Sequence, residues 1–100
     1  MTSPLRAIVL IKVKPGRRAE QEAAFAALAP VVRAEPGCLR YDLHAVEGEP
    51  DRFVLIEEWI SSEALQAHDD SEHMRKADAA NGAFRSGPAE VLLLESTPVA

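Results

Sequence analysis

The segment CLRYDLHAVEGEPDRFVLIEEWI (residues 38–60) contains two strand-like runs joined by a short polar connection. Apolar and polar side chains alternate in residues 38–46, which is the period of a β-strand. The apolar members of this run are Leu39, Tyr41, Leu43 and Ala45. The run EGEPD (47–51) has the composition of a hairpin connection, and RFVLIEEWI (52–60) is a second strand. The sequence therefore predicts a β-hairpin in the middle of the chain.

Toward the N-terminus, a strand and a helix are expected. The run LRAIVLIKVKPG (5–16) is rich in Ile, Val and Leu and is stopped by Pro15-Gly16, as a strand ended by a turn would be. The run RRAEQEAAFAALAPVVRAE (17–35) is rich in helix formers and ends at Glu35-Pro36-Gly37. Pro30 removes one backbone donor, so we expect it to kink this helix or to end its regular part. One helical face carries Phe25, Leu28 and Val32.

Two short helices are expected after the hairpin. Ser61 or Ser62 can act as the N-cap of the first, and SEALQAHDD (62–70) supplies about two helical turns. Ser71 offers a second N-cap, and EHMRKADAANGAF (72–84) is typical of a helix that ends at an Asn-Gly pair. The helical part of the chain is therefore interrupted at Ser71.

The last element is a strand within SGPAEVLLLEST (86–97), so the order of elements is β-α-β-β-α-β. This order predicts an α+β ferredoxin-like fold, with a four-stranded antiparallel sheet and helices on one face. A chain of 100 residues has the length of one domain, and we assign residues 1–100 to it.

Composition excludes several functional classes. The net charge of −5 argues against a nucleic-acid partner, which rewards clustered Lys and Arg. The aliphatic run Ala7–Ile11 is far too short to cross a membrane. Cys38 is the only cysteine, which excludes an internal disulfide and fits a reducing compartment. We therefore expect a soluble cytoplasmic protein without nucleic-acid or membrane partners.

The strands are apolar on both parities, and this pattern predicts a partner. The first strand has Ala7, Val9 and Ile11 on one parity and Ile8 and Leu10 on the other, and the third and last strands behave similarly. Helices cover only one face, and an exposed apolar sheet several strands wide exceeds what a monomer tolerates. We therefore expect a homodimer in which the open sheet faces of two copies pack together, about 10 Å apart.

Four stretches carry a resemblance to a known family: EPGCLRYDLH (35–44), PDRFVLIEEW (50–59), LQAH (65–68) and SEHM (71–74). They resemble the antibiotic biosynthesis monooxygenase domain family. That family has Pro-Gly-Cys before a Tyr-bearing strand, a Phe-x-x-x-Glu-x-Trp strand, and Ala-His followed by Ser/Thr-x-His. The similarity runs over nearly the whole chain and is strongest to the small quinol monooxygenase type.

The resemblance implies a dimeric α/β-barrel assembly with a small-molecule cavity in each subunit. Relatives include quinol and anthrone monooxygenases that use O₂ without flavin or metal, an isomerase of a phosphorylated signalling sugar, and haem-degrading enzymes. We therefore expect a cofactor-independent monooxygenase that oxidises a quinol-like or polyketide-like aromatic with O₂. The haem-degrading and anthrone-oxidising relatives use an asparagine, whereas the only asparagine here is Asn81, at a helix end.

Cofactor-free oxygenation needs a base, and His68 is the candidate because the family has a histidine at this place and imidazole titrates near neutral pH. The alternative is a helix-terminal histidine bonded to its own last carbonyls. Glu57 shares an apolar strand face, where a carboxylate needs a partner. Three roles are open for Glu57: pairing with an arginine such as Arg40, orienting a histidine, or forming the polar end of a cavity. We predict His68 and Glu57 as catalytic residues.

The candidate substrate-binding residues are Trp59, Tyr41, His73 and Phe84. Core packing is the competing explanation for the aromatic residues, and capping or solvent exposure for His73. No metal site is predicted: His68 and His73 are five residues apart across a break, and no cysteine or carboxylate joins them in a known pattern. His44 lies on the polar side of its strand, as a surface histidine would.

A second functional class stays open. The same fold and the same histidine suit a small-molecule-binding dimer, or an isomerase acting on a carbonyl or phosphorylated signalling compound without oxygen chemistry. An apolar cavity walled by aromatic residues favours oxygenation, whereas Arg or Lys in the wall favours a phosphorylated ligand.

Overall fold

Four strands form one antiparallel sheet. The computed structural model describes residues 3–100. The strands are β1 (Leu5–Lys12), β2 (Cys38–Val46), β3 (Glu49–Trp59) and β4 (Glu90–Leu94), in the spatial order β2-β3-β1-β4. Each neighbouring pair is antiparallel. This arrangement is the four-stranded sheet that the element order predicts.

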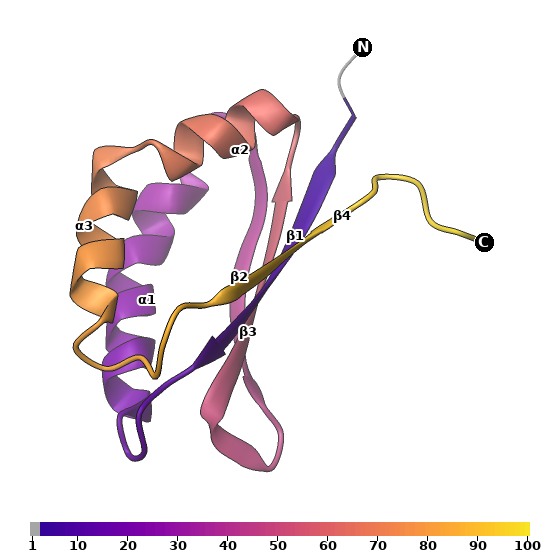
Figure 1. Ribbon diagram of the computed structural model, residues 1–100. Helices are drawn as coiled ribbons and strands as arrows, with labels where there is room; N and C mark the ends of the chain where they lie inside the picture. Colours follow the sequence, from indigo (N-terminus) through magenta and orange to yellow (C-terminus); the bar gives the residue numbers. More distant parts are fainter. Residues whose placement is uncertain (1–2) are drawn as a thin grey trace.

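Three helices lie on one face of this sheet (Figure 1). They are α1 (Arg18–Arg33), α2 (Ser62–Asp69) and α3 (Glu72–Asn81). The predicted α+β ferredoxin-like fold is therefore confirmed, with its second helical segment divided in two. Within residues 3–100, no helix combines the length and apolarity that crossing a membrane requires.

Serine side chains start both short helices. Ser61 is the N-cap of α2, and its Oγ accepts a hydrogen bond from the backbone N–H of Ala64 at 3.1 Å. Ser71 caps α3 in the same way, accepting from the N–H of Met74 at 3.3 Å. Pro30 does not end α1, which continues to Arg33. The Ser71 cap lies at the break between α2 and α3.

The structure corrects two details of the predicted hairpin. Leu39 does not share the buried face with Tyr41: the register shifts between Cys38 and Arg40, and Leu39 is the extra, exposed residue of the irregularity. Alternation of apolar and polar residues in the sequence gives no sign of such an insertion. One extra residue in a strand turns the side chains before it to the opposite face of the sheet. The connection is also shorter than 47–51, since β3 already begins at Glu49.

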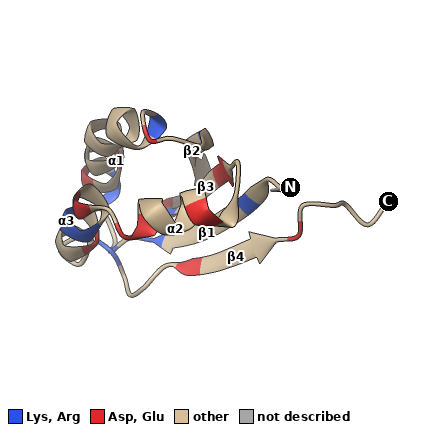
Figure 2. Ribbon diagram, turned by 90° about the horizontal axis from the view of Figure 1, so that it is seen from above, with Lys and Arg blue, Asp and Glu red and all other residues tan. Residues whose placement is uncertain are grey.

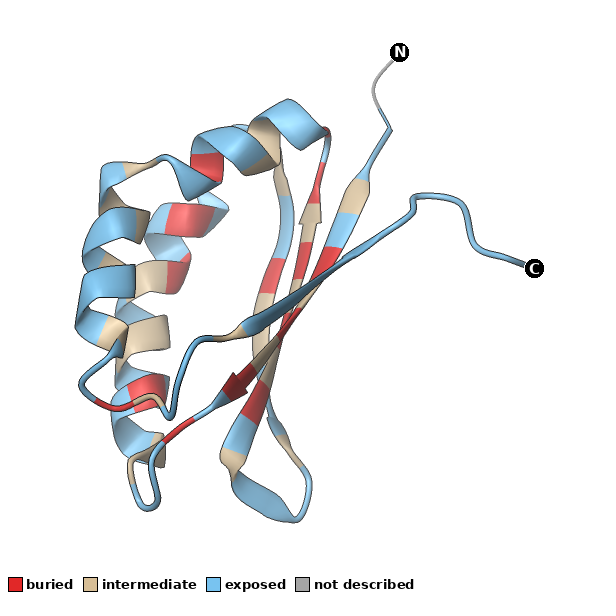
Figure 3. Ribbon diagram, viewed as in Figure 1, coloured by how far each residue is buried: buried red, intermediate tan, exposed pale blue. Residues whose placement is uncertain are grey.

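The buried residues lie where the helices face the sheet, as the red segments on both layers in Figure 3 show. β1 contributes Ala7, Val9 and Ile11 to this core. β4 is different, because it is exposed along its whole length in the single chain. It carries charge only at its first residue, Glu90, and is otherwise tan in Figure 2. The sheet therefore has an edge that its own helices do not cover.

Candidate active site

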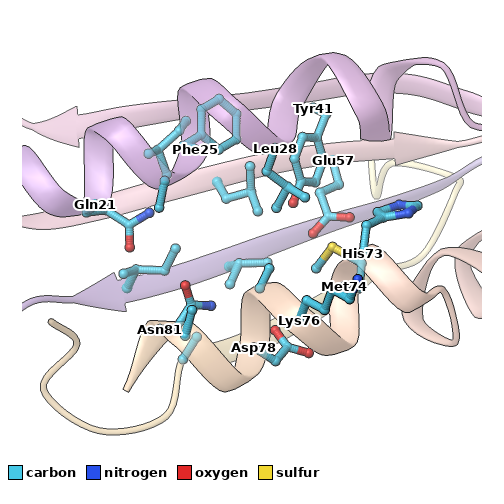
Figure 4. A pocket seen from close by; sticks show the side chains of 18 of the residues that line it. Gln21, Phe25, Leu28, Tyr41, Glu57, His73, Met74, Lys76, Asp78 and Asn81 are labelled. Carbon is cyan, nitrogen blue, oxygen red and sulfur yellow. The ribbon is translucent and has the colours of Figure 1, made fainter. Parts of the chain in front are cut away.

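A cavity of about 530 Å³ lies between the helices and the sheet (Figure 4). Its volume is within the range of small-molecule sites, and such sites have mostly apolar walls with a few polar groups. The apolar wall residues include Val9, Ile11, Phe25, Leu28, Leu43 and Leu55. The polar and titratable lining residues include Gln21, Tyr41, Glu57, His68, His73 and Arg85. A small organic molecule with a few polar substituents fits this lining.

His68 is the most tightly held of the titratable residues. It lies in the last turn of α2, and only 2% of its surface is exposed. Its ring centroid is 4.6 Å from that of Trp59 and 5.6 Å from that of Tyr41. The Ser71 hydroxyl donates to the His68 carbonyl at 2.7 Å, which ties the end of α2 to the start of α3. The imidazole is thus fixed in orientation and still lines the cavity.

Glu35 joins the two histidines. Its Oε2 lies 2.8 Å from Nδ1 of His68 and 2.9 Å from Nε2 of His73. A carboxylate can only accept hydrogen bonds, so where it is the acceptor each of these ring nitrogens donates an N–H. A neutral imidazole that donates through Nδ1 has its lone pair on Nε2. Nε2 is the nitrogen on the side of Glu57.

The turn after α1 delivers Glu35 to this position. Gly37 has φ +86°, a conformation that side-chain-bearing residues rarely adopt. A Cβ at Gly37 would lie 2.7 Å from side-chain atoms of both Ala64 and Ile60, so only glycine allows the turn to pack against the start of α2. The Gly37 carbonyl also accepts from the N–H of Ile60 at 2.9 Å. The close contact brings the Glu35 carboxylate to the two rings.

Glu57 is buried and lines the cavity. Its Oε1 accepts a hydrogen bond from Nε1–H of Trp59 at 3.0 Å and lies 3.8 Å from Nε2 of His68. Burial raises the pKa of the Glu57 carboxyl, while the Trp59 bond and the nearby His68 oppose that rise. Glu57 is therefore the polar group that faces the free nitrogen of His68.

Arg40 does not pair with Glu57, so that alternative is wrong. Arg40 contacts Asp42 at 2.9 Å and Glu58 at 3.7 Å instead. Arg40 pairs with Glu58 in the sheet register, whereas Glu57 pairs with Tyr41, and successive residues of a strand point to opposite faces. The arginine is on the open face and cannot reach the cavity.

The other predicted site residues fall into two groups. Tyr41 and His73 line the cavity, and the Tyr41 hydroxyl points into it (Figure 4). Burial, and secondarily the Glu57 carboxylate, raise the pKa of Tyr41, so its hydroxyl stays a neutral donor. Trp59 and Phe84 are buried in the core and are not among the lining residues. Trp59 instead supports His68 and Glu57 from behind.

Glu35, His68 and His73 also have the composition of a metal-ligand set. Their ligand atoms lie within 4.8 Å of one another. Two imidazoles and a carboxylate suit a divalent transition metal. The sequence has no known ligand pattern that includes a carboxylate, but in the folded chain Glu35 reaches both histidines, from 33 positions before His68 and 38 before His73. One Glu35 oxygen is hydrogen-bonded to both rings, so a metal would have to displace two protons.

Sequence reasoning missed Glu35, Gln21 and Arg85. Glu35 belongs to the Glu-Pro-Gly turn, and its place in that turn was the only available signal. Gln21 and Arg85 are 64 residues apart and meet only in the folded chain, where Nε–H of Arg85 donates to Oε1 of Gln21 at 3.0 Å.

Comparison with known proteins agrees with this architecture. The sequence profile of the family described as antibiotic biosynthesis monooxygenase matches residues 4–80. The chain belongs to the antibiotic biosynthesis monooxygenase family. The matched part of this family member includes Glu35, Glu57, His68 and His73, whereas Arg85 and β4 lie beyond it. The predicted family membership is confirmed.

Individual members of the family are similar to this chain over nearly their full length. YcnE of Bacillus subtilis, which is named provisionally as a monooxygenase, is 34% identical over 85 residues, 85% of this chain and 90% of YcnE. The structure of PA3566 from Pseudomonas aeruginosa superposes with a TM-score of 0.88 at 33% identity and 98% coverage of both chains. Rv0793 from Mycobacterium tuberculosis has a TM-score of 0.88 at 31% identity, covering 98% of this chain and 99% of its own.

Proposed function

We propose that this protein is a cofactor-independent monooxygenase that oxidises a quinol-like or polyketide-like aromatic with O₂, and that His68 is its base. The observation that carries the proposal is the Glu35–His68 hydrogen bond of 2.8 Å at the wall of a mostly apolar cavity. It holds the ring in the tautomer whose Nε2 can accept a proton. Membership in a family named for monooxygenases supports this reaction class.

In the reaction we propose, a substrate hydroxyl or acidic C–H gives its proton to Nε2 of His68. The resulting electron-rich anion reduces O₂, so the substrate itself supplies every electron. For a substrate RH₂ the balance is RH₂ + O₂ → RO + H₂O: one oxygen atom enters the product and the other leaves as water. A positioned base contributes about 10²–10⁴-fold to such a step.

Tyr41 is placed to act on the developing oxyanion, because its raised pKa keeps the hydroxyl a neutral O–H that can donate a hydrogen bond. Glu57, whose Oε1 lies 3.8 Å from Nε2 of His68, is placed to stabilise the imidazolium that forms when His68 takes the proton. The apolar wall strengthens such bonds because it excludes water. Trp59 keeps His68 and Glu57 in place through ring contact and its N–H bond. We therefore assign Trp59, like Phe84, to the shell behind the cavity.

We propose that the protein acts as a homodimer, because the sheet face away from the helices exposes apolar residues. Register places Leu92 opposite Ile8, and Ile8 opposite Ile56, on the face away from the helices. On this face of β4, Leu92 and Leu94 are 42% and 41% exposed. A second copy laid on this face would bury them. Because Cys38 is the only cysteine and is free, we also propose that the protein is located in the reducing cytoplasm.

Oxygen uptake tests the enzyme proposal. Metal-free protein is given hydroquinones in an oxygen electrode, and product is identified by mass spectrometry with ¹⁸O₂. We expect uptake that falls by about 10²–10⁴-fold in His68→Ala, because the base is lost. His44→Ala is the control, since His44 is exposed on β2 and lies outside the cavity. Equal uptake by both variants would remove His68 from the mechanism.

A second candidate is a binder or isomerase of a phosphorylated or carbonyl compound. The observation in its favour is that Lys76 and Arg85 are among the lining residues. Proton transfer by His68 would serve an isomerisation equally well, without O₂. Tight binding of a phosphorylated compound with no oxygen consumption by any hydroquinone would select this candidate.

A further inference from the structure

Arg85 occupies the connection between α3 and β4, beyond the region that the family profile matches. Its backbone is held on both sides: it forms an isolated bridge with Val13, and its N–H donates to the carbonyl of Asn81 at 2.9 Å. The side chain is partly buried and lines the same cavity as His68. A fixed backbone therefore presents a cation to the cavity.

The orientation of the Arg85 side chain is also set. Its Nε–H donates to Oε1 of Gln21, a residue that is only 2% exposed. Among residues 3–100, no carboxylate oxygen lies within 4.0 Å of the Arg85 guanidinium, whereas six other arginines do have such a partner. Arg75 also has none, but it is exposed on α3. Arg85 is thus the partly buried arginine without a paired carboxylate in the described chain.

The surroundings leave the Arg85 guanidinium without an anion in contact. Asp78 also lines the cavity, but it acts on Arg85 only at longer range. Lys76, another lining residue, is exposed and its Nζ pairs with Glu72 at 3.4 Å. Burial lowers the pKa of Arg85, and Asp78 offsets part of that effect. A desolvated cation gains more from an anion in contact than a solvated one does, so an anionic ligand would supply what this end of the cavity lacks.

Two pairs of polar residues lie at opposite ends of the cavity. In Figure 4, Gln21 and Asn81 lie toward one end and Glu57 and His73 toward the other, with Phe25 and Leu28 between them. Because Arg85 bonds Gln21, it belongs to the end away from Glu57 and His73. A ligand that filled the cavity would meet a cation at one end and the base at the other.

We propose that Arg85 binds a carboxylate carried by the aromatic substrate and so orients the oxidisable ring toward His68. The planar guanidinium matches a carboxylate fork, and a carboxylate supplies the contacting anion that Arg85 lacks. A phosphate monoester carries nearly two charges, so the nearby Asp78 carboxylate repels it more strongly than it repels a carboxylate. The inference rests on the proposed oxidation for the role of the ring, but not for the binding itself.

Anaerobic titration calorimetry tests the binding. The probes are 2,5-dihydroxybenzoate and its methyl ester, which differ in the charged group. Wild-type protein is expected to bind the acid about tenfold or more tightly than the ester, because hydrogen bonds to charged groups are the strong ones. Arg85→Gln should abolish that preference, Arg85→Lys should keep part of it, and Arg75→Gln should leave it intact.

The ratio of the affinities for the acid and for the ester decides whether the inference holds. Equal binding of acid and ester by wild-type protein, binding of neither, or a preference that survives in folded Arg85→Gln would overturn the inference. Tighter binding of 4-hydroxyphenyl phosphate than of the acid would overturn its carboxylate part. Because no O₂ is present, Arg85-dependent binding without later oxygen uptake would leave this inference standing and remove the monooxygenase. Oxygen uptake that is unchanged in Arg85→Gln and equal for acid and ester would remove this inference and leave the monooxygenase standing.

Discussion

Nδ1 of His68 lies 2.8 Å from Oε2 of Glu35, although 33 residues separate the two in the chain. Both side chains have little exposure, 2% for His68 and 13% for Glu35, so water competes weakly for the bond. A histidine oriented by a carboxylate is a recurrent device in catalysis, because the second nitrogen is then kept ready for the proton. Glu35 is thus the positioning residue of the proposed base.

Glu35→Gln is expected to lower kcat for oxygen uptake by roughly 10–100-fold, the usual effect of losing a carboxylate behind a histidine. KM should change little, since Glu35 is not among the residues that line the cavity. Nitrogen NMR of the His68 ring should show a mixture of tautomers where the wild type shows one. The matched control is Glu47→Gln in the exposed hairpin turn. A changed KM with an unchanged tautomer would assign Glu35 a merely structural role.

Glu57 should make stability depend on pH. Burial raises its folded-state pKa above the unfolded value, so over the interval between the two the folded chain binds more protons. The free energy of unfolding therefore falls as pH rises through that interval above the ordinary glutamate value. Glu57→Gln removes this term and keeps an oxygen for the Trp59 N–H. Urea unfolding from pH 4 to pH 8 should show the variant gaining stability relative to wild type as pH rises, and parallel curves would contradict this.

Metal removal should leave oxygen uptake intact, because the proposed base acts as a free imidazole. Added Zn²⁺ should inhibit oxygen uptake, since it would bind Nδ1 of His68 and Nε2 of His73 and displace the protons that these nitrogens donate to Glu35. His73→Ala should weaken the inhibition by removing one ligand. The measurement is oxygen uptake by chelator-dialysed protein, with and without metal. Activity that disappears on dialysis and returns with Fe²⁺ would make the three residues a metal centre instead.

The open sheet face should set the oligomeric state. Leu92→Lys places a charge on the face opposite the helices, next to Ile8 in the register, and should convert a dimer into a monomer. Val99→Lys is the control, because Val99 is fully exposed in the C-terminal tail. Sedimentation at micromolar concentration measures both. A wild-type protein with the mass of one protomer would end the dimer proposal.

Local sequence was sufficient for the order and type of the elements. Ser71 caps a helix and the Pro15-Gly16 pair follows a strand because both effects act over a few residues. The two faces of β1 and β3 follow from the period of two, but both parities are apolar, so the sequence did not show which face the helices cover. His68 was singled out through the resemblance to a family that has a histidine at this place, and the structure puts it at the cavity wall.

Other features depended on distant contacts. The irregularity at Leu39 arises from pairing with β3, so the alternation of residues 38–46 gives no sign of it. Trp59 has the same apolar neighbours in sequence whether it lines a cavity or lies behind it, and only the packing of α2 decides.

The chain alone determined a sheet with helices on one face, because hydrophobic period, caps and turns are properties of neighbouring residues. The tertiary structure decided which carboxylate meets which ring, and which arginine remains unpaired at the cavity. These contacts join residues 33 and 64 positions apart. Their geometry depends on how the layers pack to ångström precision, a quantity that no short window of sequence contains.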